Sequence, residues 1–421
     1  MRKFISNQLN KNDGLIKHSL VVFIAVGIVS ILNYVFHLYM GRALGPEEYS
    51  ILGVLFSLFY ILNAPASTID TIITKFSSEF KAKGEYSKIR YLLVKSFKLV
   101  IFYGIIFLIV YGLLSRYIAS FLKIDSITAV ILMGVMIFLS FLFPVVNSLL
   151  RGLQKFNWYN ANILTQAALK LILGITLVSL GFGVIGAISA INIATLIVIL
   201  LPFIPLAFLF RYKGKIEKLN IFKYSLVILV GSFVMMLMVN VDVILVKHFF
   251  PALEAGYYVA ASILAKIVWF ASGALMIVMF PKISDYHSNN RDTSSILKYT
   301  LFYTFLISLI VILIYFIAPT FVVNMLYGQE YKIDGIIGLF AIGLGFFSLS
   351  NVLVLYNFAV NKSKFIYLII LSFMIETGLI VLFHSSLLEV VKILAVVNIL
   401  LFFVLVLYTR REFGIKNGFK A

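Results

Sequence analysis

Residues 126–150 read SITAVILMGVMIFLSFLFPVVNSLL, a run of 25 residues without a single Asp, Glu, Lys or Arg. A helix of about 20 apolar residues spans the roughly 30 Å of hydrocarbon in a bilayer, so this stretch predicts a transmembrane helix. Because backbone that faces lipid must satisfy its hydrogen bonds internally, we expect every such segment to be helical. The chain predicts twelve spans, at 16–40, 49–74, 92–114, 126–150, 157–180, 183–210, 221–246, 255–280, 296–317, 334–360, 365–384 and 387–408.

The composition of the whole chain agrees with a membrane protein. Of its 421 residues 62% are apolar and 12% are charged, and the mean hydropathy is +1.06. Ordinary soluble proteins carry about 25% charged residues, so lipid is the expected solvent for this chain. There is no cysteine, the five histidines are dispersed, and no nucleotide-binding or nucleophile motif is present. We therefore expect no metal site, no cofactor and no enzymatic activity.

The basic residues predict the orientation of the chain. With the N-terminus in the cytoplasm, 26 of the 35 Lys and Arg residues fall in cytoplasmic segments and six on the opposite side. Positive charge gathers in cytoplasmic loops, so both termini are predicted to be cytoplasmic in a multi-pass protein of the cell membrane. The same rule explains the net charge of +18 without a nucleic-acid partner.

The two halves of the chain resemble one another. Residues 74–79 (TKFSSE) follow the second span as residues 281–285 (PKISD) follow the eighth, and Asn147 corresponds to Asn351. Six spans separate the halves, so both start on the same side of the membrane, as in parallel transporter repeats. We predict an all-α protein with two pseudo-symmetric six-helix lobes and a cleft between them. The expected boundaries are a lobe at 1–210, a cytoplasmic linker at 211–220, a lobe at 221–408 and a cytoplasmic tail at 409–421.

Five ionisable residues inside the predicted spans are candidates for function. An ionisable side chain at a helix centre costs about 2.5–3.5 kcal/mol on insertion scales, so we expect these residues to face a wet cavity. Interhelical hydrogen bonds, or an internal Lys–Glu pair, are the structural alternatives, and the sequence leaves them open. Lys170, Lys266 and Glu376 lie near mid-span, and Asp70 and Asp242 lie about one turn from a helix end.

Polar residues accompany these charges at helical spacing. Asn162, Gln166 and Lys170 recur every four residues and so share one face of a helix, while Asn33 and His37 line the first span. A polar stripe on an apolar helix predicts contact with a cavity or with another helix.

Residues 41–49, GRALGPEEY, resemble the signature of polysaccharide-biosynthesis flippases. These are the O-antigen, Wzx-type members of the multidrug/oligosaccharidyl-lipid/polysaccharide (MOP) transporter superfamily. The resemblance implies alternating-access transport of polyprenyl-diphosphate-linked oligosaccharide, a precursor of lipopolysaccharide or exopolysaccharide in the cell envelope. It also implies coupling to a gradient of H⁺ or Na⁺, with membrane lipids and polysaccharide-assembly proteins as partners.

The resemblance further implies a cationic cavity, to which we assign residues of this chain. Lys170, Lys266 and Arg42 are proposed for the anionic head group, and Glu376, Asp70 and Asp242 for ion coupling. The polar residues expected to line the cavity are Gln166, Asn162, Asn33 and His37.

Two other functions are compatible with a polytopic chain. A multidrug-and-toxin-extrusion (MATE) exporter would share the fold, but such exporters often carry an acidic cation site on the first helix, which here has no carboxylate. A membrane-embedded glycosyl ligase or polymerase would need a long exterior loop, and every predicted exterior loop is short. Both observations favour the flippase.

Overall fold

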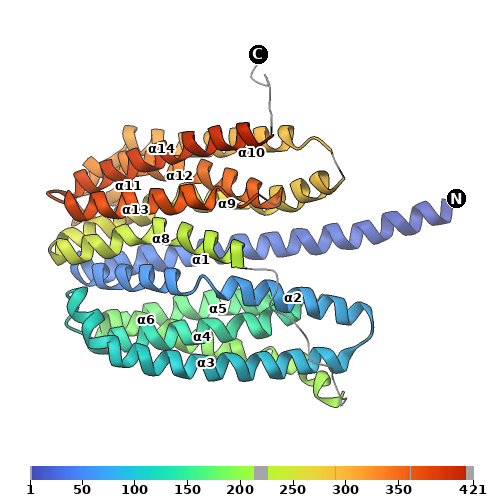
Figure 1. Cartoon of the computed structure of the whole chain (residues 1–421). Helices are drawn as coiled ribbons and strands as arrows, with labels where there is room; N and C mark the ends of the chain where they lie inside the picture. Colours follow the sequence, from blue (N-terminus) through green and yellow to red (C-terminus); the bar gives the residue numbers. More distant parts are fainter. Residues whose placement is uncertain (1, 213–225, 290, 361, 414–421) are drawn as a thin grey trace. The chain divides into compact units, whose positions relative to one another are not determined.

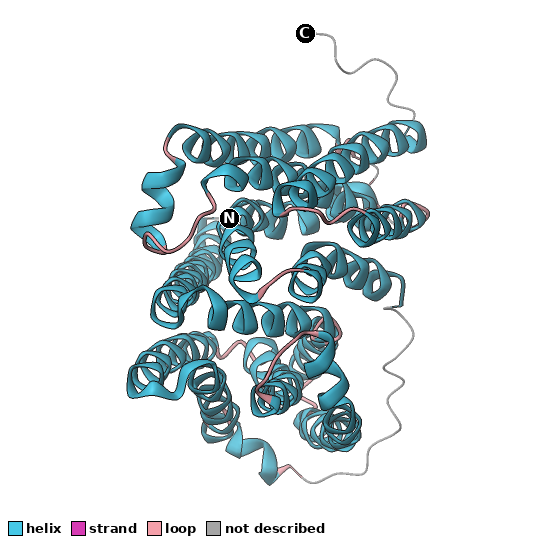
Figure 2. Cartoon of the chain, turned by 90° about the vertical axis from the view of Figure 1, so that its left-hand side faces the viewer, coloured by secondary structure: helices cyan, strands magenta, loops and turns pink. Residues whose placement is uncertain are grey.

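The computed structural model describes residues 2–212, 226–289, 291–360 and 362–413, and these residues form helices joined by short loops, without a strand (Figure 2). By their internal contacts the residues form two compact units. The first unit comprises residues 1–44 and 62–224, and the second comprises 45–61 and 225–421. The predicted linker at 211–220 lies almost entirely outside the described residues, so the predicted lobe boundaries stay a prediction.

The first unit is a helical bundle arranged around α4 (Figure 1). Helix α4 packs against α2, α3 and α6, while α5 packs against α6. Most residues of α4 are buried, as expected for a helix surrounded by others. The elements are the first part of α1 (Arg2–Leu62), α2 (Ala66–Ala82), α3 (Tyr86–Phe121), α4 (Ile127–Gly152), α5 (Phe156–Leu177), a π-helical turn at Val178–Phe182, α6 (Gly183–Leu200), α7 (Phe203–Leu206) and a 3₁₀ turn at Ala207–Arg211.

The second unit is a bundle arranged around α12. Helix α12 packs against α9, α10 and α14, and α8 packs against both α9 and α13. The second unit begins at Gly45. At this residue φ is 70°, which divides α1 into two helices. Glycine adopts this conformation without strain. The other elements are α8 (Leu226–Phe249), α9 (Ala252–Ser288), α10 (Ser294–Ile317), α11 (Pro319–Leu326), α12 (Asp334–Ala359), α13 (Ile366–Leu382) and α14 (Leu387–Phe413).

The helices confirm the predicted membrane architecture. Among the described residues nine helical segments are long and apolar enough to span a membrane. The segment Phe156–Arg211 contains two predicted spans, divided at Gly181–Gly183. The segment Val21–Leu62 covers most of the predicted span 16–40 and the first part of the span 49–74, divided at Gly45. The shorter apolar helix Ile366–Leu382 matches the predicted span at 365–384. The chain is therefore a multi-pass membrane protein of about twelve helices.

One predicted span is interrupted. The segment 49–74 contains the end of α1 and the start of α2, separated by a turn in which the Ala66 amide donates to the Asn63 carbonyl at 2.9 Å. Pro65 has no amide hydrogen and so cannot continue the hydrogen bonding of α1, but its fixed φ suits the position just before a new helix. Hydropathy alone does not register this break.

Candidate functional site

Lys170 is held between two helices of the first unit. Its ammonium donates a hydrogen bond to the Asn33 side-chain oxygen and lies 4.5 Å from the centre of the Phe36 ring. Helices α1 and α5 approach closely one turn further on, where a Cβ on Gly174 would lie 2.6 Å from a Phe36 ring carbon. A small residue at such a crossing brings two membrane helices together, and this positions the lysine over the ring.

No carboxylate pairs with Lys170 among the residues that the structure describes. An amide oxygen and an aromatic face stabilise a cation, but neither neutralises its charge. The half-buried amine of Lys170 therefore has no counter-charge of its own among these residues.

The side-chain amides of Gln166 and Asn162, which share the helical face of Lys170, donate hydrogen bonds to α6 and not to α1. The Gln166 amide donates to the Thr195 hydroxyl at 3.3 Å, and the Asn162 amide donates to the Val198 carbonyl at 3.0 Å, both on α6. Asn162 also donates to the Asn147 side chain of α4 at 3.3 Å. The predicted stripe thus divides, because only its last member reaches α1.

The second unit contains a buried acidic site between α8, α9 and α13. The Tyr258 hydroxyl donates to one Asp242 carboxylate oxygen at 2.8 Å, and the Lys266 ammonium donates to the Asn240 side-chain oxygen at 3.2 Å. Asp242 is 2% exposed and Glu376 is fully buried, so neither carboxylate faces lipid. Tyr258 and Asn240 were not predicted as site residues, since a tyrosine or an asparagine on an apolar helix gives no signal by itself.

The Glu376 side chain is fully buried but makes no hydrogen bond among the described residues. Neither of its carboxylate oxygens, nor the second oxygen of Asp242, has a hydrogen-bond donor within the described part of the chain. The two carboxylates lie close enough to interact electrostatically, and Asp242 also interacts with Lys266. Lys266 therefore interacts with Asp242, while the Glu376 oxygens have no donor among these residues. Buried polar atoms without partners are rare enough to need an explanation.

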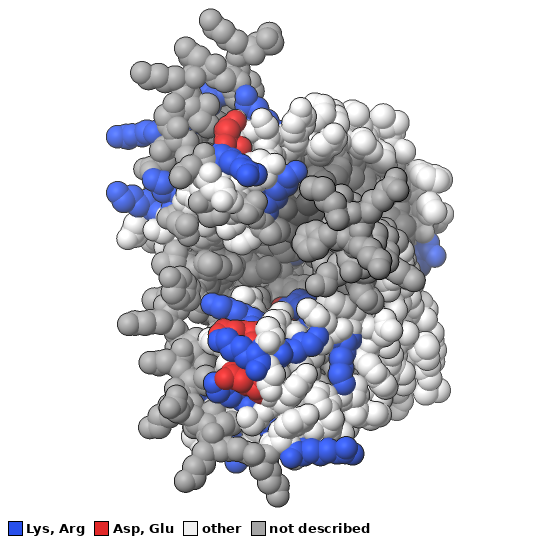
Figure 3. Space-filling view, turned by 90° about the vertical axis from the view of Figure 1, so that its right-hand side faces the viewer, with Lys and Arg blue, Asp and Glu red and all other residues white. Residues whose placement is uncertain are grey.

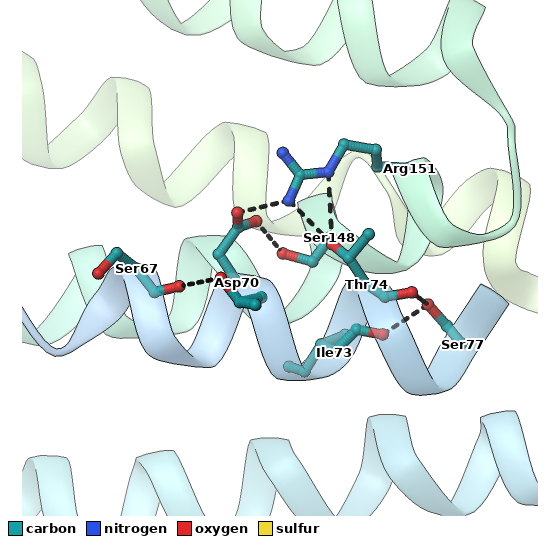
Figure 4. A network of polar contacts seen from close by, with 8 residues as sticks. Ser67, Asp70, Ile73, Thr74, Ser77, Ser148 and Arg151 are labelled. Carbon is teal, nitrogen blue, oxygen red and sulfur yellow. Dashed lines mark hydrogen bonds and ion pairs between the residues drawn. The ribbon is translucent and has the colours of Figure 1, made fainter. Parts of the chain in front are cut away.

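Asp70, the third acidic candidate, is engaged in an ion pair with Arg151 of α4 (Figure 4). The Ser148 hydroxyl donates to the other oxygen of the same carboxylate. Arg151 also donates to the Thr74 hydroxyl, from Nη2 at 2.9 Å and from Nε at 3.3 Å. Asp70 and Thr74, four residues apart on α2, thus face Ser148 and Arg151, three residues apart on α4. Helical spacing places each pair on one face of its helix but does not predict that the two faces meet.

The remaining candidates lie on α1. Arg42 is exposed, and His37 is half-buried one turn after Asn33. Within the described residues no three His, Asp or Glu side chains come together as a metal site.

Basic side chains gather at the helix ends where α2 gives way to α3 (Figure 3). The exposed Glu79 and Lys83 form an ion pair of 2.6 Å there, and the ammonium of Lys83 holds the pKa of the Glu79 carboxyl below its usual value. Lys155, in the turn between α4 and α5, donates to the Pro205 carbonyl at 2.5 Å, and burial lowers the pKa of its ammonium. Lys83 and Lys155 are therefore each engaged in a contact within the protein.

The signature segment lies in the second unit from Gly45 onward. The Tyr49 hydroxyl is within 3.2 Å of the Tyr327 hydroxyl, and the buried Lys247 ammonium donates to the Ser50 hydroxyl at 2.8 Å. Gly256 of α9 lies directly against the backbone of Pro46. The segment therefore packs α1 against α8, α9 and the end of α11.

Comparison with known families identifies the chain. The model of a family described as polysaccharide biosynthesis protein matches residues 39–333, which is well over half of the sequence. The chain belongs to this family. The resemblance drawn from residues 41–49 is thereby confirmed. No curated protein matches the sequence.

Solved structures of MOP-superfamily transporters resemble this polysaccharide biosynthesis family member. An inward-facing multidrug resistance MATE family transporter of that superfamily matches with a TM-score of 0.77 and 15% identity, over 94% of this chain and 98% of its own. The lipid II flippase MurJ in an inward closed conformation matches with a TM-score of 0.70 and 15% identity, over 94% and 87%. A MOP superfamily transporter from Pyrococcus furiosus gives 0.58 and 17% identity, over 95% of each chain. These likenesses confirm the predicted fold class.

Proposed function

We propose that this protein flips polyprenyl-diphosphate-linked oligosaccharide across the cell membrane by alternating access, driven by a gradient of H⁺ or Na⁺. Its membership of the polysaccharide biosynthesis family supports a saccharide substrate. A transporter fold, shared with a protein named as a lipid II flippase, supports movement of a lipid-linked substrate. In this proposal both termini are cytoplasmic, and polysaccharide-assembly proteins supply and receive the substrate.

The observation that carries the proposal is the position of Lys170, which has no carboxylate partner among the described residues. A diphosphate brings about two negative charges into the membrane, and a lysine ammonium binds phosphate as a mobile point charge. Asn33 and Phe36 hold the ammonium without neutralising it. A charged hydrogen bond to the diphosphate is thus available there, and it is stronger than one between neutral groups.

The acidic site of the second unit has the opposite balance and suits a cation. Asp242 and Glu376 together exceed the charge of Lys266 by one, when all three are ionised. A proton on Glu376, or a sodium ion at the free carboxylate oxygens, would balance that charge. The membrane potential supplies about 2.3 kcal/mol per charge per 100 mV, so such a cation can power transport. Asp70 is already balanced by Arg151, so we assign coupling to Asp242 and Glu376.

The test is flipping in proteoliposomes that contain the full chain and a labelled polyprenyl-diphosphate saccharide. An impermeant reagent that modifies the sugar reports the fraction of substrate moved, with and without an imposed H⁺ or Na⁺ gradient. Lys170→Gln should lower the rate about ten- to a hundredfold, because a hydrogen bond to a charged group is worth about 1.5–3 kcal/mol. Lys98→Gln is the matched control, since it removes the same charge from an exposed position on α3.

The coupling site is tested in the same vesicles. Glu376→Gln mimics the neutral carboxyl, so flipping should continue without responding to either gradient. Glu330→Gln, which changes an exposed carboxylate between α11 and α12, should keep the gradient response. Wild-type flipping by both Lys170→Gln and Glu376→Gln would contradict the assigned sites. Export of organic cations with no movement of the lipid-linked saccharide would favour the MATE-type exporter instead.

A further inference from the structure

In the ion pair of Asp70 and Arg151, two different side chains donate hydrogen bonds to one carboxylate. Arg151 Nη2 donates to one oxygen and the Ser148 hydroxyl to the other, while Thr74 holds the guanidinium from the side (Figure 4). The two other ion pairs seen among the described residues join a lysine to a glutamate three or four positions away in the chain. Of these three pairs, the pair of Asp70 and Arg151 links two helices and brings a hydroxyl donor to the acid.

The donors around the Asp70 carboxylate form a set that suits a phosphate group. A guanidinium presents two parallel N–H donors that match two oxygens of a carboxylate or of a phosphate. Within the described residues Arg151 donates to the Asp70 carboxylate through Nη2 alone, so the second arm of the fork does not hydrogen-bond the acid. Ser148 is itself fully buried, which fixes its hydroxyl at the bottom of the site.

The Asp70 carboxylate can move away from Arg151 at a small cost in free energy. The side chains of Arg151 and Asp70 are 34% and 36% exposed, so a ligand can reach both without opening the core of the unit. Ion pairs with this much exposure are weak, because water screens them and side-chain entropy opposes them. A diphosphate carries more charge than one carboxylate and can compete for the same donors. Tyr159, whose ring lies 5.9 Å from the guanidinium, keeps Arg151 in place when the acid departs.

We propose that Arg151, Ser148 and Thr74 form a second diphosphate-binding site in the first unit, and that Asp70 occupies it as an internal substitute when no ligand is bound. In the predicted orientation this end of α2 and α4 is cytoplasmic. The site would receive the diphosphate before Lys170 does, so this inference rests on the proposed function. Asp70 would favour release by returning to Arg151 once the substrate moves on.

The experiment measures binding to the purified full-length protein at fixed ionic strength by isothermal titration. The two ligands are inorganic diphosphate and farnesyl diphosphate, which separate free phosphate from a lipid head group. Asp70→Asn removes the internal competitor, so binding should tighten about fivefold, which corresponds to about 1 kcal/mol. Arg151→Gln should weaken binding at least tenfold. Glu79→Gln is the matched control, because it removes one exposed carboxylate from the same helix and should leave binding unchanged.

Each result decides for or against the site. Tightening of both ligands by Asp70→Asn indicates a general diphosphate site, and tightening of farnesyl diphosphate alone indicates a lipid head-group site. Equal affinities in Asp70→Asn, Glu79→Gln and the wild type would overturn the proposal. If Asp70→Asn does not yield a monodisperse protein, Arg151→Lys is compared with the wild type, since it keeps the charge but loses the fork. Binding of wild-type strength by Arg151→Lys would also overturn it.

Flipping assays separate this site from the proposed function. If diphosphate binding follows Arg151 but the wild type moves no saccharide, the flippase proposal fails and the site stands. If the wild type flips its substrate and Arg151→Gln binds and flips equally well, the site fails and the flippase proposal stands.

Discussion

Gly256→Ala is the substitution for which the structure gives the sharpest expectation. Gly256 belongs to the first turns of α9, and a Cβ built there would lie closer than 3.0 Å to three backbone atoms of Pro46. Real Cβ atoms essentially never approach other atoms so closely, so either α9 or the signature segment must shift. Pro46 cannot rotate away as a side chain would. It is followed by Tyr49, which is completely buried, so the segment has little room to move.

The magnitude follows from two opposing terms. Alanine is favoured over glycine inside a helix by about 0.8–1 kcal/mol. Overpacking a tight site costs about 1–3 kcal/mol, and a clash with backbone belongs at the upper end of that range. We therefore expect Gly256→Ala to destabilise the protein by about 2 kcal/mol, taking the difference of these two terms.

Gly273→Ala is the matched control on the same helix. Nothing lies within 4 Å of a Cβ at Gly273, so only the propensity term applies there. This variant should gain up to about 1 kcal/mol, which places the two variants about 3 kcal/mol apart. The entropy of unfolding scales with chain length, so 1 kcal/mol moves the melting temperature by about 1 °C in a chain of this size.

Thermal unfolding in detergent, followed by tryptophan fluorescence at one heating rate, measures the difference. Gly256→Ala should melt about 3 °C below Gly273→Ala, with the wild type between them. Should Gly256→Ala melt together with or above Gly273→Ala, the close contact between Pro46 and α9 would not exist as described. The reasoning that the signature segment anchors the second unit would then fail as well.

Three further outcomes are expected. Single cysteines at positions 83 and 215, introduced into this cysteine-free chain, should react with an impermeant thiol reagent only after the cells are permeabilised, and labelling from outside would reverse the predicted orientation. Ser50→Ala should lower the melting temperature, because the Lys247 ammonium, 2% exposed, loses an acceptor at 2.8 Å and such losses cost about 1–3 kcal/mol. The Lys83 ammonium lowers the pKa of Glu79, so their pair exists at neutral pH and is lost only on acidification through that lowered pKa. Since both groups are exposed, Glu79→Gln should melt like the wild type at pH 7 and at pH 5.

The membrane spans could be predicted closely because each depends on a local property. A long apolar run specifies a helix by itself in lipid, and the observed helices end within a few residues of most predicted spans. The predicted span at 49–74 missed a helix break because hydropathy is averaged over a window that includes Asn63 and Pro65. A single missing amide hydrogen, at Pro65, is enough to end a helix.

The partners of the charged residues could not be predicted, because they come from distant parts of the chain. Lys170 bonds to Asn33, which lies 137 positions earlier, and Arg151 pairs with Asp70 across 81 positions. Helical spacing places a residue on a face but does not say which helix that face meets. The alternative of an internal pair between Lys266 and Glu376 gains no support, since Lys266 bonds to Asn240 and the Glu376 oxygens have no donor within the described residues.

The signature segment at 41–49 and the residues proposed to act on the substrate have only Arg42 in common. The signature segment provides a helix break at Gly45, a backbone contact at Pro46 and a buried tyrosine at Tyr49. All three are requirements of packing in the second unit, and none presents a charge to a ligand. Lys170 and Glu376 lie outside the signature, on helices that would span the membrane equally well without them. Under the proposed function, a change at either position would alter what the protein carries or what drives it, while the signature and the fold stayed the same. This separation is the physical reason why a shared fold, such as the one seen in a MATE transporter and in MurJ, does not by itself specify the transported molecule.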